Sequence, residues 1–255
     1  MKEPLLAIVR RAGELILKAD AFRVEQKEGH ANFVTSVDEE VQRFLIAQLI
    51  SLLPGSRVIS EEQENSALTN DPTWVIDPLD GTTNFIHHFR FSAVSVALLQ
   101  NREPVIGVVY QPYSDEMFYA EKNRGAELNG RSIHVSANPI EQAVVGFGTS
   151  PYELELAEKS MKAALCFLQH AADVRRCGSA ALDLAYVAAG RQDVFFEFIL
   201  RPWDYAAGSL LVREAGGVFR MPMLNEPDYA QTTAVLASNQ PCASAASEWL
   251  KPFWR

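Results

Sequence analysis

Cysteine is scarce in this 255-residue chain, which contains only Cys166, Cys177 and Cys242. None of them forms a CxxC pair, and an odd, sparse set does not make a disulfide framework. We therefore expect reduced thiols in a cytoplasmic protein. Long apolar runs are also missing. The N-terminal segment lacks the pattern of a signal peptide, and no window reaches the roughly 18 apolar residues of a membrane span.

Positive charge is in short supply, because 23 Lys and Arg residues face 32 Asp and Glu residues, for a formal net charge of -9. This balance argues against a dedicated nucleic-acid binder. It leaves room for an anionic small substrate, since bound metal ions reverse the local field inside a cleft. The sequence also lacks GxSxG, GxxxxGK[ST] and a GxGxxG after a strand. A serine hydrolase, a P-loop enzyme and a Rossmann oxidoreductase are therefore unsupported.

Hydrophobic residues make up 48% of the chain, which is enough for one large core or two packed cores. In residues 1–139 the periodicity predicts an α+β half with two paired helices and a largely antiparallel sheet. In residues 140–255 strands and helices alternate, as in α/β layers. We expect the two halves to fuse into one compact unit with the ligand cleft between them. The expected strands are 57–60, 73–77, 91–100, 104–112, 116–121, 132–136, 143–148, 173–178, 193–198, 217–221 and 233–238.

The second predicted helix starts close to several polar residues. Ser36 and Glu39 have the spacing of a capping box. Asp38 caps or opens the same helix, and Lys27 lies in a polar loop before it. Both of these residue types are more often structural or solvated at such positions, so the local pattern alone assigns them no chemistry.

The stretch DPLDGTTNF (77–85) carries the strongest chemical pattern in the chain. Asp77 ends an apolar strand, and Pro78 turns the chain so that Asp80 comes near Asp77. Two carboxylates this close both stay ionised only if a cation lies between them. Carboxylates and a carbonyl, here that of Leu79, are ligands that Mg²⁺ prefers. The alternative is an ordinary strand end with Asp residues in a turn.

An anion site is predicted directly beside this cation site. Gly81, Thr82 and Thr83 open a short helix, and free N–H groups at a helix start attract phosphate. Adjacent cation and anion sites are what metal-assisted phosphoryl transfer requires. The sequence therefore favours a phosphate-handling site over a plain turn.

Three further acidic residues are candidates, each with a plain alternative. Glu61, in the Glu61-Glu62 pair after a predicted strand, is a candidate metal ligand or a residue of a solvated loop. Asp204 heads a helix, so it is either a third carboxylate of a two-metal site or an N-cap. Glu197 lies between two phenylalanines of a predicted strand. It either accepts a hydrogen bond from a sugar hydroxyl or points to solvent.

With DPLDGTTNF, the upstream Glu-Glu pair and the downstream WDYAAG (203–208) in hand, the chain resembles the inositol monophosphatase family. These are lithium-sensitive, Mg²⁺-dependent phosphomonoesterases, and the LRPWD form (200–204) is most similar to bacterial members. The resemblance runs from Lys27 and TSVD (35–38) to REAGG (213–217), nearly the whole chain. It departs at Ser60, where members often have Gly, and we expect Ser60 to stiffen the following loop.

The resemblance implies a layered αβαβα sandwich of the inositol monophosphatase and fructose-1,6-bisphosphatase type, a homodimer, and two to three Mg²⁺ ions per site. Its metal ligands would be Glu61, Asp77 and the Leu79 carbonyl for the first ion, Asp77, Asp80 and Asp204 for the second, and Glu61 for a weaker third. Its catalytic residues would be Glu61, Thr82 and Asp38, which activate the attacking water, with Lys27 on a mobile loop. Its substrate-binding residues would be Asp80, Gly81, Thr82, Gly178, Ser179, Ala180, Glu197 and Asp204.

The expected reaction is hydrolysis of an inositol monophosphate by a metal-activated water, without a covalent enzyme intermediate. Related phosphatases act on fructose 1,6-bisphosphate, histidinol phosphate or 3′-phosphoadenosine 5′-phosphate, and these substrates stay open as alternatives. A bisphosphate would require a second basic pocket, for which the candidates are Arg175, Arg176, Arg191 and Arg201. A protein- or RNA-interaction role, with Arg191 and Arg201 in the interacting surface, is an alternative of another class.

Overall fold

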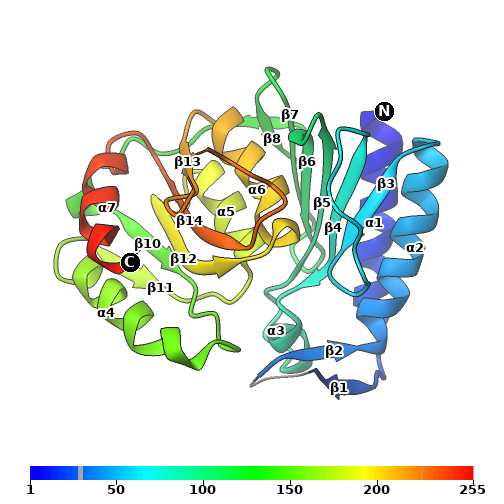
Figure 1. Ribbon diagram of the computed structural model, residues 1–255, viewed down its shortest axis with the longest axis horizontal. Coiled ribbons are helices and arrows are strands. Elements are labelled where there is room, and N and C mark those ends of the chain that lie inside the picture. The colour runs from blue at the N-terminus through cyan, green and yellow to red at the C-terminus, as the bar shows by residue number, and fades with distance from the viewer. Residues whose placement is uncertain (28–30, 225, 255) are drawn as a thin grey trace.

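The computed structural model describes residues 1–27, 31–224 and 226–254. Five layers follow one another across the molecule (Figure 1). Helices α1 and α2 cover the outer face of a seven-stranded sheet, α5 and α6 lie between the two sheets, and α4 and α7 cover the outer face of a five-stranded sheet. The expected αβαβα sandwich is confirmed.

The first two layers come from the N-terminal part of the chain. Strand β3 pairs with β4 in parallel, and every other pair of the seven-stranded sheet is antiparallel. The elements of these layers are α1 (Lys2–Leu17), α2 (Ser36–Leu52), β3 (Arg57–Ser60), β4 (Thr73–Asp80), β5 (Ala93–Gln100), β6 (Glu103–Gln111), β7 (Glu116–Glu121), β8 (Ala126–Leu128) and β9 (Arg131–Ile133).

Both faces of the seven-stranded sheet are covered, so β4 and β5 are buried almost throughout. Alternate side chains go to different cores. Trp74 and Ile76 of β4 pack toward α1 and α2. Val75 of β4 and Ala97 of β5 pack toward α5 and α6. The face of β4 that carries Val75 is therefore the face directed to the interior between the sheets.

The middle layer packs closely because its residues are small. Helix α5 (Ala180–Ala188) is rich in alanine, and α6 (Pro202–Glu214) has a run of small residues at 206–209. A Cβ added to Gly208 of α6 would lie 2.5 Å from the Leu184 side chain of α5, and one added to Gly107 of β6 would lie 2.7 Å from the Ala207 carbonyl. Glycine at these two positions lets the helices sit against each other and against the sheet.

The five-stranded sheet and its outer helices complete the fold. Strand β10 is parallel to both β11 and β12, whereas β14 is antiparallel to β12 and β13. The remaining elements are β1 (Val24–Gln26), β2 (Phe33–Thr35), α3 (Thr82–Ile86), η1 (Ile140–Gln142), β10 (Val144–Phe147), η2 (Leu154–Leu156), α4 (Ala157–Leu168), β11 (Asp173–Arg175), β12 (Val194–Leu200), β13 (Val218–Arg220), β14 (Thr233–Ser238), α7 (Ala243–Leu250) and η3 (Lys251–Phe253).

The seven-stranded sheet ends at Ile133 and the five-stranded sheet begins at Val144. The proposed division into residues 1–139 and 140–255 falls between them, and we keep it as a description of two halves of one unit. Of the helices in the described part of the chain, none combines the length and apolar character needed to span a bilayer.

Two local predictions are wrong in register. The N-cap of α2 is Thr35 rather than Ser36, and its capping-box partner is Asp38 rather than Glu39. The Thr35 hydroxyl accepts from the Val37 and Asp38 amides, while the Thr35 amide donates to Asp38 at 2.8 Å. Aspartate can return the bond from the third helical position as Glu does. The capping box fixes the Asp38 side chain, which also accepts a hydrogen bond from Thr82 in the candidate site.

Candidate active site

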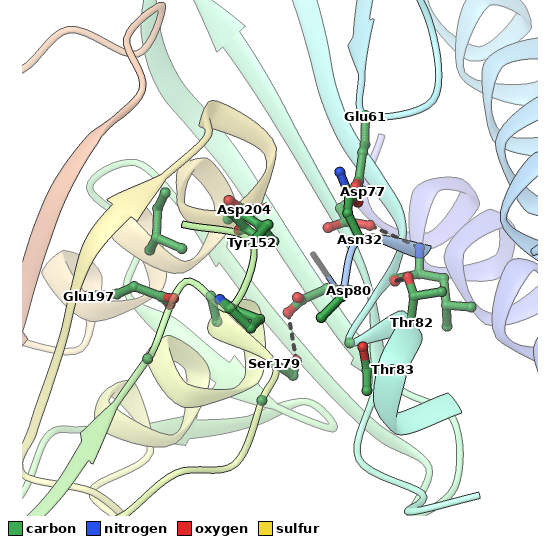
Figure 2. Close-up of a pocket in the computed structure, with 18 of the residues that line it drawn as sticks. Asn32, Glu61, Asp77, Asp80, Thr82, Thr83, Tyr152, Ser179, Glu197 and Asp204 are labelled. Carbon is green, nitrogen blue, oxygen red and sulfur yellow. Dashed lines mark hydrogen bonds between the residues drawn. The ribbon is translucent and has the colours of Figure 1, made fainter. Parts of the chain in front are cut away.

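A cavity of about 310 Å³ opens between the two halves of the chain. Figure 2 shows its side chains, with Thr82 and Thr83 on one side and Asp204, Tyr152 and Glu197 on the other. Of the sequence-predicted site residues, the cavity brings together Glu61, Asp77, Leu79, Asp80, Gly81, Thr82, Gly178, Ser179, Ala180, Glu197 and Asp204. Residues from 61 to 204 in the sequence therefore meet at one place.

A bulge in β4 explains why Asp77 and Asp80 face the same way. The strand was expected to end at Asp77, but it continues to Asp80 with a register shift between the two. Asp77 pairs with Ser95 and Asp80 with Ala93. Three steps on β4 thus match two on β5, and residues two apart on a strand share a face. The bulge at Pro78 and Leu79 directs both carboxylates to the interior between the sheets.

Hydrogen bonds hold these two carboxylates. One Asp80 oxygen accepts from the Ser179 hydroxyl at 2.6 Å and from the Ala181 amide at 2.8 Å, both at the start of α5. An Asp77 oxygen accepts from the Leu79 amide at 3.0 Å. Asp80 is therefore tied across the cavity to the C-terminal half, while Asp77 is held within its own turn (Figure 2).

Thr82 joins the motif to α2. Its hydroxyl lies 3.1 Å from an Asp38 carboxylate oxygen and 3.1 Å from the Leu79 carbonyl oxygen. The other Asp38 oxygen is occupied by the capping interaction with Thr35. Asp38 is buried, and it can orient the Thr82 hydroxyl because the capping box fixes its rotamer.

Glu61 and Glu62 form a turn that α2 holds from behind. The Gln42 amide nitrogen donates to the Glu62 carbonyl at 2.8 Å, and the Ser60 hydroxyl donates to the Gln42 side-chain oxygen. Lys27 contacts both acids, and its ammonium nitrogen lies 3.2 Å from a Glu61 oxygen. Lys27 lies next to residues 28–30, outside the described ranges, so its place on a mobile loop stays a prediction.

The prediction that Asp204 is an N-cap is wrong, because the N-cap of α6 is Arg201, but Asp204 takes part in the capping box of this helix. It is the third residue of α6, and its carboxylate accepts from the Arg201 amide at 2.6 Å, as a helix-capping group does. It also lines the main cavity and a smaller neighbouring cavity of about 110 Å³. The capping bond fixes the carboxylate without removing it from the cavity.

Glu197 is buried, so the solvent-facing alternative for it is wrong. One of its oxygens accepts from the Ser150 amide at 2.9 Å and lies 3.1 Å from the Ser150 hydroxyl. Gly148 passes so close that an added Cβ would lie 1.9 Å from the Glu197 carboxyl carbon. The carboxylate is thus clamped at the cavity wall by the segment that follows β10.

Burial and mutual repulsion raise the pKa values of the acids around the cavity. Burial raises the pKa of Asp77 and of Asp204 well above the ordinary value, and the charges of Glu61 and Asp80 add to it in both cases. Burial likewise raises the pKa of Asp80 to about 6, although the bonds from Ser179 and Ala181 oppose the shift. Burial raises the pKa of Glu197 to about 7. A bound cation would relieve this repulsion.

The donor set around the cavity consists of oxygen atoms, which suits a hard divalent cation. Across residues 1–27, 31–224 and 226–254, no three acidic, histidine or cysteine side chains already converge at metal-binding distance. The carboxylates instead line the walls of one cavity and act on one another electrostatically. The chemistry of these oxygen donors, all in one cavity lining, therefore fits a metal site.

Several lining residues had no role, or only a candidate role, in the sequence-based prediction, and three of them are polar residues of the C-terminal half. Tyr152 lies in a turn with no periodic pattern to single it out. Asp183 is a buried carboxylate of α5, and its position inside an apolar helix was an available signal. Arg176 was named only as one of four basic candidates, and it lines the main cavity while Arg201 lines the smaller one.

The other two basic candidates, Arg175 and Arg191, lie outside the linings of both cavities and pair with acids elsewhere. Arg175 contacts Asp173, and Arg191 contacts Glu116. They therefore contribute no charge directly to the cavity walls.

Comparison with known proteins shows the family to which the chain belongs. A sequence model of the inositol monophosphatase family matches residues 1–251. Nus factor SuhB of Salmonella typhimurium is 41% identical over 246 residues, covering 92% of this chain and 91% of the relative. Inositol monophosphatase 1 of Sus scrofa is 36% identical over 245 residues, covering 92% and 87%. The structure of a Thermotoga maritima IMPase matches with a TM-score of 0.89 at 32% identity, covering 98% and 96%.

Proposed function

The chain belongs to the inositol monophosphatase family, and we propose that it is a Mg²⁺-dependent phosphomonoesterase that hydrolyses an inositol monophosphate to inositol and phosphate. Members of this family are phosphatases that act on small phosphorylated substrates. The observation that carries the proposal is the cavity in which the β4 bulge, the turn after β3 and the start of α6 place four carboxylates together.

Mg²⁺ would be held by Glu61, Asp77, Asp80 and Asp204 together with the Leu79 carbonyl. When bound, Mg²⁺ supplies charge neutralisation for the phosphate and lowers the pKa of water. The raised pKa values of Asp77 and Asp204 support this assignment, because buried acids that repel one another gain from a shared cation. We propose two to three ions per site from the family resemblance.

The protein residues would position the phosphate and the attacking water. Gly81 has a left-handed backbone (φ 89°), which aims the start of α3 toward the cavity, and its N–H with that of Thr82 would bind phosphate oxygens. The Thr82 hydroxyl, oriented by Asp38 at 3.1 Å, and the Glu61 carboxylate would align the water and accept its proton. The water proton would pass to the Glu61 carboxylate as the water oxygen forms a bond to phosphorus. The bond between phosphorus and the alcohol oxygen would break, and that oxygen would take up a proton from solvent water.

The opposite wall would receive the alcohol. Glu197, fixed by Ser150, would accept hydrogen bonds from substrate hydroxyls, and Asp204 would do the same beside the metal site. Gly178, Ser179 and Ala180 would line the space between them. This wall offers acceptors to a polyhydroxy leaving group, which supports a polyol rather than an apolar alcohol.

The alternative substrates differ in the positive charge they require. A bisphosphate calls for a second basic pocket, and Arg176 is the only arginine, lysine or histidine among the described residues of the main cavity lining. The smaller cavity is lined by Lys27, which is paired with Glu61 and Glu62, and by Arg201, which lies over the Trp203 ring. This distribution favours a monophosphate over fructose 1,6-bisphosphate or 3′-phosphoadenosine 5′-phosphate.

A phosphatase screen tests the proposal. The purified chain would be assayed for phosphate release from inositol, sugar and nucleotide phosphates and from histidinol phosphate, with Mg²⁺ and with a chelator. We expect inositol monophosphate to give the highest kcat/KM and the chelator to abolish release. Preferred hydrolysis of a bisphosphate or nucleotide in the same screen would move the assignment to that substrate.

A second role in binding other macromolecules has one observation in its favour, the name Nus factor SuhB of the Salmonella relative. Arg191, one residue of the surface considered for it, is engaged by Glu116 and lies over the Tyr186 ring. A pull-down with wild-type chain and with Asp204→Asn tests the role, because an interaction independent of catalysis survives the substitution. A cytoplasmic location and a homodimer remain proposals from the sequence and the family resemblance.

A further inference from the structure

Tyr152 lies where the two cavities meet. The main cavity and the smaller one share four lining residues, and Tyr152 is one of them, with Asn32, Glu61 and Asp204. Figure 2 shows Tyr152 with Asp204, on the side of the cavity opposite Thr82 and Thr83. Its side chain therefore belongs to the wall that we assign to the alcohol and not to the wall that we assign to the phosphate.

The segment that carries Tyr152 is fixed in place. Ser150, two residues earlier, is buried and has φ +42°, a conformation that a residue other than glycine rarely adopts. It is held there by the hydrogen bonds from its amide and hydroxyl to Glu197. Strain maintained by such bonds marks a segment whose position is determined by its surroundings. Glu197 and Tyr152 are thus presented to the cavity as one unit.

The chemistry of this wall is incomplete without Tyr152. Asp204, Glu197 and Glu61 are the acids whose charges act on the Tyr152 hydroxyl. Carboxylates only accept hydrogen bonds, whereas a tyrosine hydroxyl also donates. A polyol hydroxyl both donates and accepts, so it is satisfied by a carboxylate on one side and a tyrosine on the other. The flat ring also offers an apolar face to the C–H face of a sugar-like ring.

We propose that Tyr152 is a specificity-determining residue that binds the polyol part of the substrate, with its hydroxyl donating to a substrate hydroxyl oxygen. The inference rests on the proposed function and adds to it the residue that selects a polyhydroxy leaving group. Simple alkyl phosphates have no free hydroxyl group besides the esterified oxygen, so the Tyr152 hydroxyl would not strengthen their binding.

The test compares wild type, Tyr152→Phe and Tyr152→Ala on inositol 1-phosphate and on ethyl phosphate with Mg²⁺. Loss of one neutral hydrogen bond predicts that Tyr152→Phe raises KM for inositol 1-phosphate about 5-fold, with kcat within about 2-fold. Tyr152→Ala also removes the ring, so it should raise KM for inositol 1-phosphate about 20-fold relative to wild type. The KM for ethyl phosphate should change less than about 2-fold in Tyr152→Phe.

Tyr186→Phe is the matched control, because Tyr186 packs between Phe91 and Phe118 and lies outside both cavity linings. Product inhibition separates the two walls. Tyr152→Phe should raise the inhibition constant of free inositol and leave that of inorganic phosphate unchanged.

Three results would overturn the inference. One is an equal change in KM for both substrates with Tyr152→Phe, and another is a change confined to inhibition by phosphate. The third is a Tyr152→Phe variant whose KM and kcat for inositol 1-phosphate equal those of wild type. If Asp80→Asn abolishes hydrolysis of inositol 1-phosphate in the same experiment, the proposed function still stands. A wild-type chain that releases no phosphate from either compound would overturn both proposals.

Discussion

The two walls of the cavity are built in different ways. The wall that carries Asp77, Asp80, Gly81 and Thr82 comes from one continuous stretch, shaped by a single bulge in β4. The opposite wall is assembled from the turn after β10, the start of α5, the strand β12 and the start of α6. One local device fixes the first wall, whereas the second depends on the packing of four segments. We infer that the first wall, together with Glu61 and Asp204, carries the reaction, and that the rest of the second wall selects the alcohol.

The difference extends to how the charged groups are held. Asp80 joins the two walls, because it comes from β4 and is bound by the Ser179 hydroxyl and the Ala181 amide of the other wall. Glu197 and Asp204 are instead tied within the C-terminal half, to Ser150 and to the Arg201 amide. A change at Asp80 should therefore disturb both walls, and a change at Glu197 only one.

Asp80→Asn is expected to have the largest effect. It removes the charge of a proposed metal ligand while keeping the shape of the side chain. Activity should fall about 10³-fold or more, the scale of a lost preorganised electrostatic group. The measurement is Mg²⁺-dependent phosphate release under saturating substrate, with exposed Asp115→Asn as the control. Near-wild-type turnover by Asp80→Asn would refute the assignment of the first wall.

The second prediction concerns pH and Mg²⁺ together. Asp77, Asp80 and Asp204 have raised pKa values in the folded protein, about 6 for Asp80. Their contribution to stability is therefore full below about pH 4 and is lost as pH rises through 6 and above. Chelator-treated protein should melt at a lower temperature at pH 8 than at pH 5.

Mg²⁺ should reverse this loss, since metal binding requires the ionised carboxylates. At 100 times its dissociation constant it stabilises by about 2.7 kcal/mol, which corresponds to roughly 5–10 °C for a chain of this size. Thermal melts with Mg²⁺ and with a chelator at both pH values measure the effect. A gain from Mg²⁺ that is as large at pH 5 as at pH 8, or that persists in Asp80→Asn, would argue against the carboxylate site.

The first wall could be predicted from sequence because its residues are contiguous. Asp77, Asp80 and Thr82 form a sequence pattern that predicts a metal and phosphate site without knowledge of the fold. The second wall could not be read this way. Asp204 and Glu197 carried equally good structural explanations, and only the family resemblance selected them. Tyr152 lies in an irregular turn, so no periodicity pointed to it.

The local errors have the same origin. The register of the α2 cap differed by one residue because Thr35-Ser36-Val37-Asp38-Glu39 offers two hydroxyls and two acids with capping spacing. Packing decides between them: the structure buries Asp38 and leaves Glu39 exposed. Likewise, alternation alone could not tell that Glu197 points into a polar cavity rather than to solvent.

Gly148→Ala should disturb the second wall alone. The added Cβ would lie 1.9 Å from the Glu197 carboxyl carbon, so Glu197 must move and its bonds to Ser150 must weaken. We expect KM for inositol 1-phosphate to rise about 10-fold, equivalent to about 1.4 kcal/mol, with kcat within about 3-fold. Steady-state kinetics measure both parameters.

Gly55→Ala is the control for Gly148→Ala, because an added Cβ at Gly55 meets nothing within 4 Å and Gly55 lines neither cavity. It should lower stability slightly through its left-handed backbone and leave KM unchanged. If Gly148→Ala lowers kcat as severely as Asp80→Asn, the division of labour between the walls does not hold.

The smallest effect is expected at Asp183, a buried residue of α5 in the lining of the main cavity. Burial raises its pKa to about 8, opposed by a 2.8 Å hydrogen bond from Gln192. Ionisation in the folded state is thus unfavourable, and the stability that Asp183 contributes is full below about pH 4 and is lost as pH rises through 8. Asp183→Asn keeps a neutral side chain of the same shape at every pH. It should raise the stability of metal-free protein by about 1 kcal/mol or more at pH 8, roughly 2–4 °C, and change nothing near pH 4.

Thermal melts of Asp183→Asn between pH 4 and 9 measure this, with Asp173→Asn as the control. Asp173 also lies in the C-terminal half, but its pKa is lowered, chiefly by a hydrogen bond from Arg175, so its substitution should give no gain that grows with pH. Activity of Asp183→Asn should stay within about 2-fold of wild type, because the second wall would use this residue for support and not for contact. A loss of activity comparable to that of Gly148→Ala would instead place Asp183 among the residues that bind the alcohol.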